Sequence, residues 1–236
     1  MFFALWPDME TVEHLSALAR HMVTGSPDTA MRIVPAQNLH MTLAFIGAVD
    51  AAQLATLETI AGEVSAEFLA FATTTGDTDP LAHERALRVR LDRLGFWAQG
   101  GILWAGSRPE RAIGMASAAL SPSRQRRLFD AQPAGHGSLP KRLATLLTQR
   151  LRVAGFRLDT RPFVPHVTLA RGVRGIAVPH LETPLSWTAR TFALVESIPR
   201  ARHPRYATLA AFPLCPAALG GNDEDGDEEN AGYVDD

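Results

Sequence analysis

The stretch Arg161–Gly172, RPFVPHVTLARG, decides the expected fold because it joins a β-prone run to one histidine and one threonine two positions apart. The stretch Asn38–Gly47, NLHMTLAFIG, repeats the same His-x-Thr-Leu-Ala core. Residues i and i+2 of a β-strand project from the same face. We therefore expect two strands that each present a histidine beside a threonine, with the intervening side chains facing a core. The four residues are His40, Thr42, His166 and Thr168.

Two such strands on opposite walls of a cleft would bring four polar side chains to one point. The unperturbed pKa of histidine is about 6.5, so at neutral pH one imidazole can be neutral while the other is protonated. One can take a proton from a nucleophile while the other protonates a leaving group. A threonine hydroxyl can donate to a phosphate oxygen. The pattern therefore favours displacement at phosphorus without a metal.

Other interpretations of the same residues stay open. The histidines can be satisfied side chains of half-buried strands, and the threonines can be ordinary strand formers. A zinc site would need three or four protein ligands, and neither motif has a nearby Cys, Asp or Glu. We expect no metal and no cofactor. Arg161 either braces its strand or touches a substrate, and the remaining histidines are expected on the surface. The four tryptophans are expected in the core or between lobes.

The segments around the two motifs alternate between strand and helix patterns. Asp8 and Asp50 are expected to cap two helices, with Gln53 completing a capping box, and a third helix is expected from Ser138. Further strands are expected at residues 2–6, 85–94, 102–105, 191–196 and 206–212. This order predicts an α+β fold with antiparallel pairing and two related lobes.

Composition places the chain among ordinary globular proteins. It has 236 residues, of which 46% are hydrophobic and 20% charged. No run approaches the roughly 18 to 20 apolar residues of a membrane helix, and the apolar start predicts a strand rather than a signal peptide. Cys215 is the only cysteine, so no intrachain disulfide can form. We expect a cytoplasmic protein without membrane contact.

Two internal segments and the C-terminal end do not fit the repeating pattern. Residues 73–84 and 107–137 are rich in Gly, Pro, Ser, Asp and Arg and are expected to be insertions in one domain spanning residues 1–215. Residues 216–236 are expected to form an acidic, disordered tail. Eight acidic residues follow position 221, which leaves 17 acidic against 23 basic residues, about +6, for the body. A mildly basic body suits a polyanionic ligand.

The paired motifs resemble the 2H phosphoesterase superfamily, in particular the RNA 2′,3′-cyclic phosphodiesterases historically called 2′-5′ RNA ligases. The resemblance spans Phe2 to Leu214 and includes the stretches FFALWP, ILWAG and RYATLAAFPL. It implies a bilobal α+β fold with two antiparallel sheets, helices outside and a central cleft. It also implies that His40 donates a proton and His166 accepts one.

The resemblance extends to the phosphate-binding residues. It implies that Thr42, Thr168 and Arg171 bind the substrate phosphate. Phe45 occupies the position in the first motif that Arg171 has in the second, so the two halves are not chemically symmetric. Phe45 and Tyr206 are expected in the wall of the cleft.

The activity implied is hydrolysis of RNA-terminal 2′,3′-cyclic phosphodiesters to 2′-phosphomonoesters. Two alternatives remain: 2′-5′ RNA ligation, which is the reverse reaction on the same site, and a non-catalytic nucleotide- or RNA-binding module. The expected partner is RNA with a 2′,3′-cyclic phosphate end or a small cyclic nucleotide, bound by a monomer. The sequence does not choose among tRNA fragments, oligoadenylates and small cyclic nucleotides.

Overall fold

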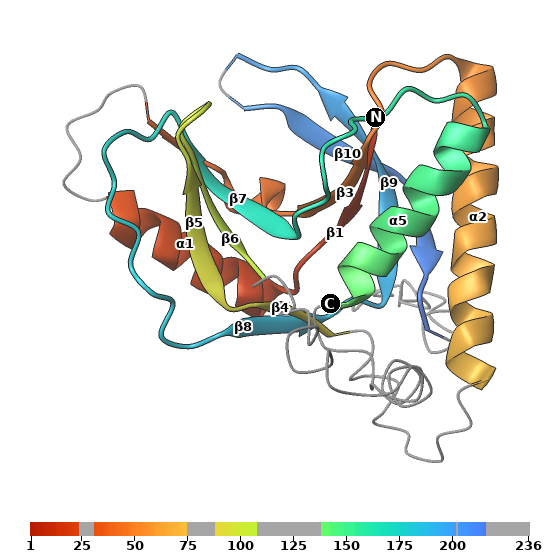
Figure 1. The fold of residues 1–236 in the computed structure, drawn as a ribbon. Helices are drawn as coiled ribbons and strands as arrows, with labels where there is room; N and C mark the ends of the chain where they lie inside the picture. The colour runs from red at the N-terminus through yellow and green to blue at the C-terminus, as the bar shows by residue number, and fades with distance from the viewer. Residues whose placement is uncertain (24–30, 75–87, 108–137, 202, 216–236) are drawn as a thin grey trace, which may run out of the picture.

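The computed structural model describes five segments of the chain, residues 1–23, 31–74, 88–107, 138–201 and 203–215 (Figure 1). The acidic tail lies outside these residues, as do both expected insertions apart from their first positions. The order of helices and strands in the described segments is α+β, with every strand pairing antiparallel, as the sequence predicts.

The first sheet contains the strand of the first His-x-Thr motif. Its strand order is β10-β9-β1-β3, so β3 lies at an edge. The strands are β1 (Phe2–Leu5), β3 (Met41–Phe45), β9 (Thr191–Ile198) and β10 (Arg205–Pro213). The sheet therefore joins strands from both ends of the chain.

The second sheet contains the other motif, in the order β2-β7-β6-β5, and a small third sheet pairs β4 with β8. These strands are β2 (Arg32–Ile33), β4 (Arg88–Leu91), β5 (Arg93–Trp97), β6 (Ile102–Gly106), β7 (His166–Arg171) and β8 (Leu185–Thr188). The prediction of a single strand at 85–94 is wrong, because β4 and β5 are separate strands that pair in different sheets. β2 and β8 were not expected, because two and four residues are too few for a recognisable alternation.

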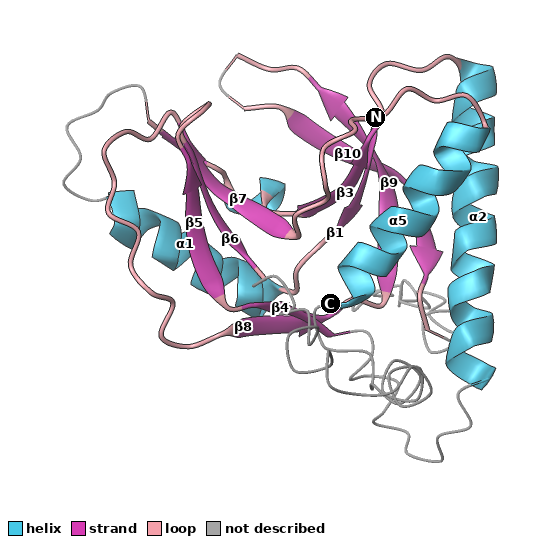
Figure 2. Cartoon of the chain, viewed as in Figure 1, coloured by secondary structure: helices cyan, strands magenta, loops and turns pink. Residues whose placement is uncertain are grey.

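Three helices pack against the sheets (Figure 2): α1 (Met9–Val23), α2 (Ala51–Thr74) and α5 (Ser138–Val153). The predicted caps are confirmed. The Thr11 amide donates to Asp8 Oδ1 at 2.9 Å. The amides of Asp50 and Gln53 donate to each other's side chains at 3.0 and 2.8 Å.

The helices do not pack against the sheets in the order in which they follow one another in the chain. α2 and α5 pack side by side against the first sheet, whereas α1 packs against β7 and β8 (Figure 1). Arg150 of α5 joins the neighbouring helix by ion pairs to Glu63 at 2.6 Å and Glu67 at 2.8 Å. Each lobe therefore contains elements from both halves of the chain. No helix in the described segments combines the length and apolarity needed to cross a membrane.

Alternation along β1 and β3 separates the core from the opposite face of the first sheet. Phe3, Leu5 and Met41 are fully buried and join the main core with Leu57 of α2 and Leu143 of α5. The intervening residues of β1 belong to a separate small apolar cluster on the other face. That other face borders the cleft described next.

Candidate functional site

A cleft of about 370 Å³ lies between the first and second sheets. Its wall is formed by residues of β1, β3, β9 and β10 on one side and by residues of β2 and β7 on the other. All seven residues singled out from the sequence line it. They are His40, Thr42, Phe45, His166, Thr168, Arg171 and Tyr206. Phe45 is 64% exposed and therefore lies at the mouth.

Each histidine is held by the carbonyl two residues before it. His40 Nδ1 lies 2.7 Å from the Asn38 carbonyl oxygen, and His166 Nδ1 lies 2.7 Å from that of Val164. A carbonyl oxygen only accepts hydrogen bonds, so Nδ1 carries the proton in both rings. Nε2 is then the nitrogen left for acid–base chemistry. His40 Nε2 lies 3.0 Å from Thr42 Oγ1.

The protein environment favours the neutral form of both imidazoles. Burial lowers the pKa of His40 to about 4. The hydrogen bond to Asn38 opposes this shift, and the charges of His166 and Arg171 add to it. Burial also lowers the pKa of His166. The hydrogen bond that Nδ1 donates to the Val164 carbonyl opposes this shift, and the charge of Arg171 adds to it. The ordinary value of about 6.5 assumed from the sequence is therefore too high for both residues.

Aromatic rings surround both histidines, and among them only Tyr206 was expected in the cleft from the sequence. His40 is surrounded by Phe2, Trp6 and Tyr206, with ring centroids 4.9, 5.4 and 5.1 Å away. Trp97 meets His166 edge-on at 4.6 Å, with Trp104 at 6.2 Å. The tryptophans were expected in the core or between lobes. That expectation holds for Trp104 and Trp187, which are buried. It did not include the contacts that Trp6, Trp97 and Trp104 make with the two histidines.

The electrostatic character of the cleft is positive. The charge of Arg171 adds to the effect of burial in lowering the pKa of both histidines, and it opposes the effect of burial, which raises the pKa of Tyr206. Arg32 also lines the cleft and stands opposite Arg171 in the pairing of β2 with β7. No Asp or Glu is among the described residues that line the cleft. An anionic ligand is therefore favoured.

Three further residues line the cleft although no local sequence pattern marked them as site residues. Asn38, Ser197 and His203 line it, although His203 was expected on the surface. Arg161, whose role was open, donates to the Asp159 carboxylate at 2.8 and 2.5 Å and is not part of the lining. The described residues hold no cluster of three or more His, Cys, Asp or Glu placed to bind a metal.

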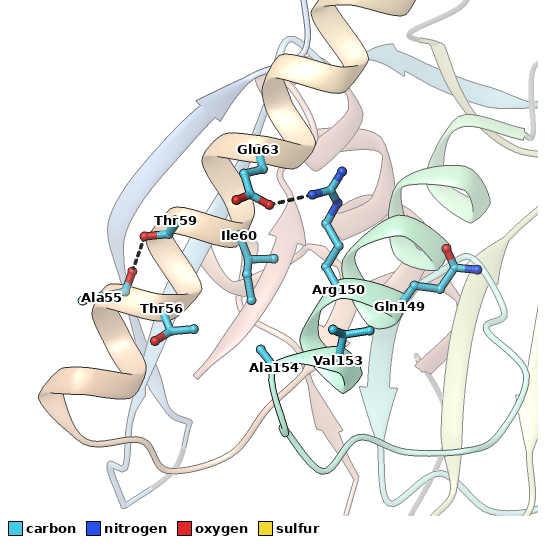
Figure 3. A pocket seen from close by; sticks show the side chains of 9 residues that line it. All are labelled: Ala55, Thr56, Thr59, Ile60, Glu63, Gln149, Arg150, Val153 and Ala154. Carbon is cyan, nitrogen blue, oxygen red and sulfur yellow. Dashed lines mark hydrogen bonds and ion pairs between the residues drawn. The ribbon is translucent and has the colours of Figure 1, made fainter.

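A second, larger hollow of about 560 Å³ lies between α2 and α5 (Figure 3). Its lining is mostly apolar, with Ile60 and Val153 facing it and Glu63 paired to Arg150 at its edge. The Thr59 hydroxyl donates to the Ala55 carbonyl within its own helix at 3.0 Å. None of the histidines and threonines of the two motifs lines this hollow, so the smaller cleft is the candidate site.

Comparison with known proteins agrees with this site. The model of the family described as LigT like phosphoesterase matches residues 5–78. The RNA 2′,3′-cyclic phosphodiesterase of Escherichia coli (strain K12) is 25% identical over 216 residues, covering 91% of this chain and 96% of the relative. The protein of the same name from Geobacillus stearothermophilus is 27% identical over 217 residues, covering 89% of this chain and 56% of the relative.

Solved structures share the fold across most of the chain. The crystal structure of Escherichia coli LigT complexed with 3′-AMP matches with a TM-score of 0.62 and 25% identity, covering 90% of this chain and 95% of that one. The crystal structure of a Thermus thermophilus protein, TT0787, matches with a TM-score of 0.56 and 24% identity, covering 90% and 96%.

Two facing antiparallel sheets that each supply a His-x-Thr strand to one cleft define the fold of the 2H phosphoesterases. Within that class, the chain is similar to the LigT like phosphoesterase family over residues 5–78 and to the curated relatives along most of its length.

Proposed function

We propose that the protein hydrolyses RNA-terminal 2′,3′-cyclic phosphodiesters to 2′-phosphomonoesters by paired-histidine acid–base catalysis. The observation that carries the proposal is the matched geometry of the two rings. His40 and His166 are each held at Nδ1 by a backbone carbonyl, and both line one cleft with Arg171 and two threonines. The names of the relatives from Escherichia coli and Geobacillus stearothermophilus support the same reaction.

The proposed reaction is a single displacement at phosphorus. His166 Nε2 takes a proton from water, and the water oxygen forms a bond to phosphorus. The bond from phosphorus to the ribose O3′ breaks, and His40 Nε2 gives its proton to O3′. Arg171 and the two threonines hold the non-bridging oxygens, where hydrogen bonds to developing charge are strongest. The 2′-phosphomonoester remains on the ribose.

His40 must gain its proton when substrate binds, because its pKa of about 4 keeps it neutral in the free protein at pH 7. A phosphodiester anion beside the ring favours the imidazolium and raises the pKa. Protonated Nε2 can no longer accept a hydrogen bond from Thr42, so the threonine hydroxyl hydrogen becomes available to a phosphate oxygen, and Nε2–H is available to O3′. The negative charge of the substrate therefore favours the protonated form of His40 that acts as the general acid.

The proposal places this reaction in the cytoplasm and assigns it to a monomer acting on RNA ends or small cyclic nucleotides. RNA ligation uses the same site in reverse, with a 5′-hydroxyl in place of water. Water in excess favours hydrolysis, so we propose hydrolysis as the main activity.

The test uses adenosine 2′,3′-cyclic phosphate and an RNA oligomer ending in a 2′,3′-cyclic phosphate, with and without EDTA. His40→Ala and His166→Ala should each lower kcat by about 10²- to 10⁴-fold. His14→Ala is the matched control, because His14 is exposed on α1 and should leave kcat unchanged. Full activity of both cleft variants would contradict the proposal. Loss of wild-type activity in EDTA would contradict its metal-independent form.

A further inference from the structure

A second cavity of about 490 Å³ continues from the catalytic cleft. It lies between the short 3₁₀ helix η1 (Ala36–Asn38) and the turn that joins β9 to β10. Five residues line both spaces, which makes the two cavities one continuous groove. These residues are Pro35, Asn38, His203, Pro204 and Tyr206.

The second cavity has its own cationic side chains. Arg200 and Arg205 line it and do not line the catalytic cleft, where Arg32 and Arg171 lie. Among the described residues, no Asp or Glu lines either cavity. The groove therefore has two separate pairs of arginines, whereas a nucleoside cyclic phosphate carries a single anion.

The wall between the cavities is tied to the catalytic histidine. The Asn38 side chain donates to the Pro204 carbonyl at 2.8 Å, and the Asn38 carbonyl accepts from His40 Nδ1 at 2.7 Å. Tyr206 lines both cavities, with its ring 5.1 Å from that of His40. The turn that carries the second arginine pair is thus anchored beside the first histidine.

The size of each space fits one nucleotide better than two. Binding sites for small ligands have volumes of roughly 300 to 1,000 Å³, and the catalytic cleft is at the lower end of that range. A terminal nucleotide with its cyclic phosphate would occupy it. In RNA the next anionic group is the phosphodiester on the 5′ side, and the chain would pass Tyr206, whose ring offers a surface for a base.

We infer that the second cavity is a subsite for the nucleotide on the 5′ side of the terminal one, with Arg200 and Arg205 binding the linking phosphodiester. This inference rests on the proposed function and narrows its substrate class: the protein acts preferentially on the ends of oligonucleotides and only weakly on free cyclic mononucleotides.

The test compares kcat/KM for adenosine 2′,3′-cyclic phosphate with kcat/KM for the diadenylate that ends in a 2′,3′-cyclic phosphate. The dinucleotide should be favoured at least about tenfold by the wild type, the effect of one or two hydrogen bonds to a charged group. The double variant Arg200→Ala/Arg205→Ala should lose this advantage while keeping the wild-type rate on the mononucleotide. The advantage should also fall as salt rises.

The control is the double variant Arg88→Ala/Arg157→Ala, which removes the same charge at exposed positions outside both cavities. It should keep the dinucleotide preference. Equal kcat/KM values for the two substrates in the wild type, or an equal loss of preference in the control, would overturn the subsite.

Failure of the proposed function gives a different result, because the wild type would then turn over neither substrate. In that case the subsite is tested by calorimetry with the 2′-phosphate-ended diadenylate and adenosine 2′-monophosphate as probes. Tighter binding of the dinucleotide that depends on Arg200 and Arg205 supports the subsite, and equal binding overturns it.

Discussion

His40 directly precedes β3 of the first sheet and His166 begins β7 of the second. Their environments differ in one respect that matters for chemistry. His40 has Thr42 on Nε2, whereas the ring of His166 packs edge-on against Trp97. Both histidines are partly buried, and this burial lowers both pKa values. At the scale of single residues, the central property of the site is therefore the lowered pKa of each imidazole, which keeps both rings neutral near pH 7 in the free protein.

The pH dependence of turnover should reveal this property. kcat/KM needs one neutral and one protonated imidazole in the free protein. Both pKa values lie below 6.5, so kcat/KM should peak below that pH and fall on its basic side. A bound phosphodiester anion raises both values, so the basic limb of kcat should lie at higher pH. The limbs are macroscopic and belong to the pair.

Initial rates across about pH 4 to 9, as kcat and as kcat/KM, provide the measurement. If the basic limbs of the kcat and kcat/KM profiles coincide, or if kcat/KM is greatest above pH 7, the histidine pKa values of the free protein are not lowered as described.

Stability should also depend on His40. Its pKa is about 4 in the folded protein and about 6.5 in the unfolded chain, so the unfolded state binds more protons between these values. The free energy of unfolding should therefore fall as pH decreases from 6.5 to 4, by about 3 kcal/mol from this residue. Urea unfolding of His40→Asn should show a shallower pH dependence than the wild type. His14→Asn, at an exposed position, is the control, and equal slopes for all three proteins would refute the effect.

At the scale of elements, the pair β5–β6 positions the aromatic rings beside His166. Gly95 of β5 stands opposite Trp104 of β6, and a Cβ atom at Gly95 would overlap the Trp104 indole. That indole is buried and packs against Trp97, with ring centroids 5.1 Å apart. The absence of a side chain at residue 95 is therefore what allows the second ring to lie near the histidine.

Gly95→Ala should destabilise the protein by about 1 to 3 kcal/mol, because the added methyl overpacks a filled space. It should also lower kcat more than it changes KM, since the rings that hold His166 must shift. Gly62→Ala is the matched control: Gly62 lies in α2 with no atom within 4 Å of the added Cβ. That change should stabilise the helix by about 0.5 to 1 kcal/mol. Denaturant melts and steady-state kinetics measure both effects, and an unaltered melt for Gly95→Ala would be inconsistent with the packing described.

At the scale of the whole molecule, the two lobes share chain segments. The first sheet takes two of its four strands, β9 and β10, from the C-terminal end, α1 packs on the second sheet, and α5 packs on the first. Neither lobe can be completed by a continuous half of the chain. The two lobes should therefore fold as one cooperative unit, and the cleft between them forms only when both are folded.

This interleaving predicts a single unfolding transition. Tryptophan fluorescence reports on the packing around Trp97 and Trp104 of the second sheet, Trp6 beside the first sheet and Trp187 of β8. Far-UV circular dichroism reports on all helices and strands. The two signals should give the same urea midpoint, as expected for two-state unfolding. Two separated midpoints would mean that the lobes unfold independently.

Local rules of the sequence were sufficient for the main elements of the site. The period of two in a strand places His40 beside Thr42 and His166 beside Thr168, and the repeat of that pattern indicates a shared cleft. Capping chemistry located the starts of α1 and α2 for the same reason: each signal involves residues at most four apart. Fold class and the chemical type of the cleft were therefore predictable from sequence alone.

Only the tertiary structure decided which distant residues surround these side chains. The pairing of β2 with β7 sets Arg32 opposite Arg171, and the packing of the sheets brings Trp97 to His166 and the turn after β9 to Asn38. Such contacts join residues separated by tens of positions and leave no local pattern. They also set the pKa values, because burial of an imidazole depends on every element that packs around it. The sequence by itself determined which polar groups line the cleft, and the packing determined their protonation and the course of the groove beside them.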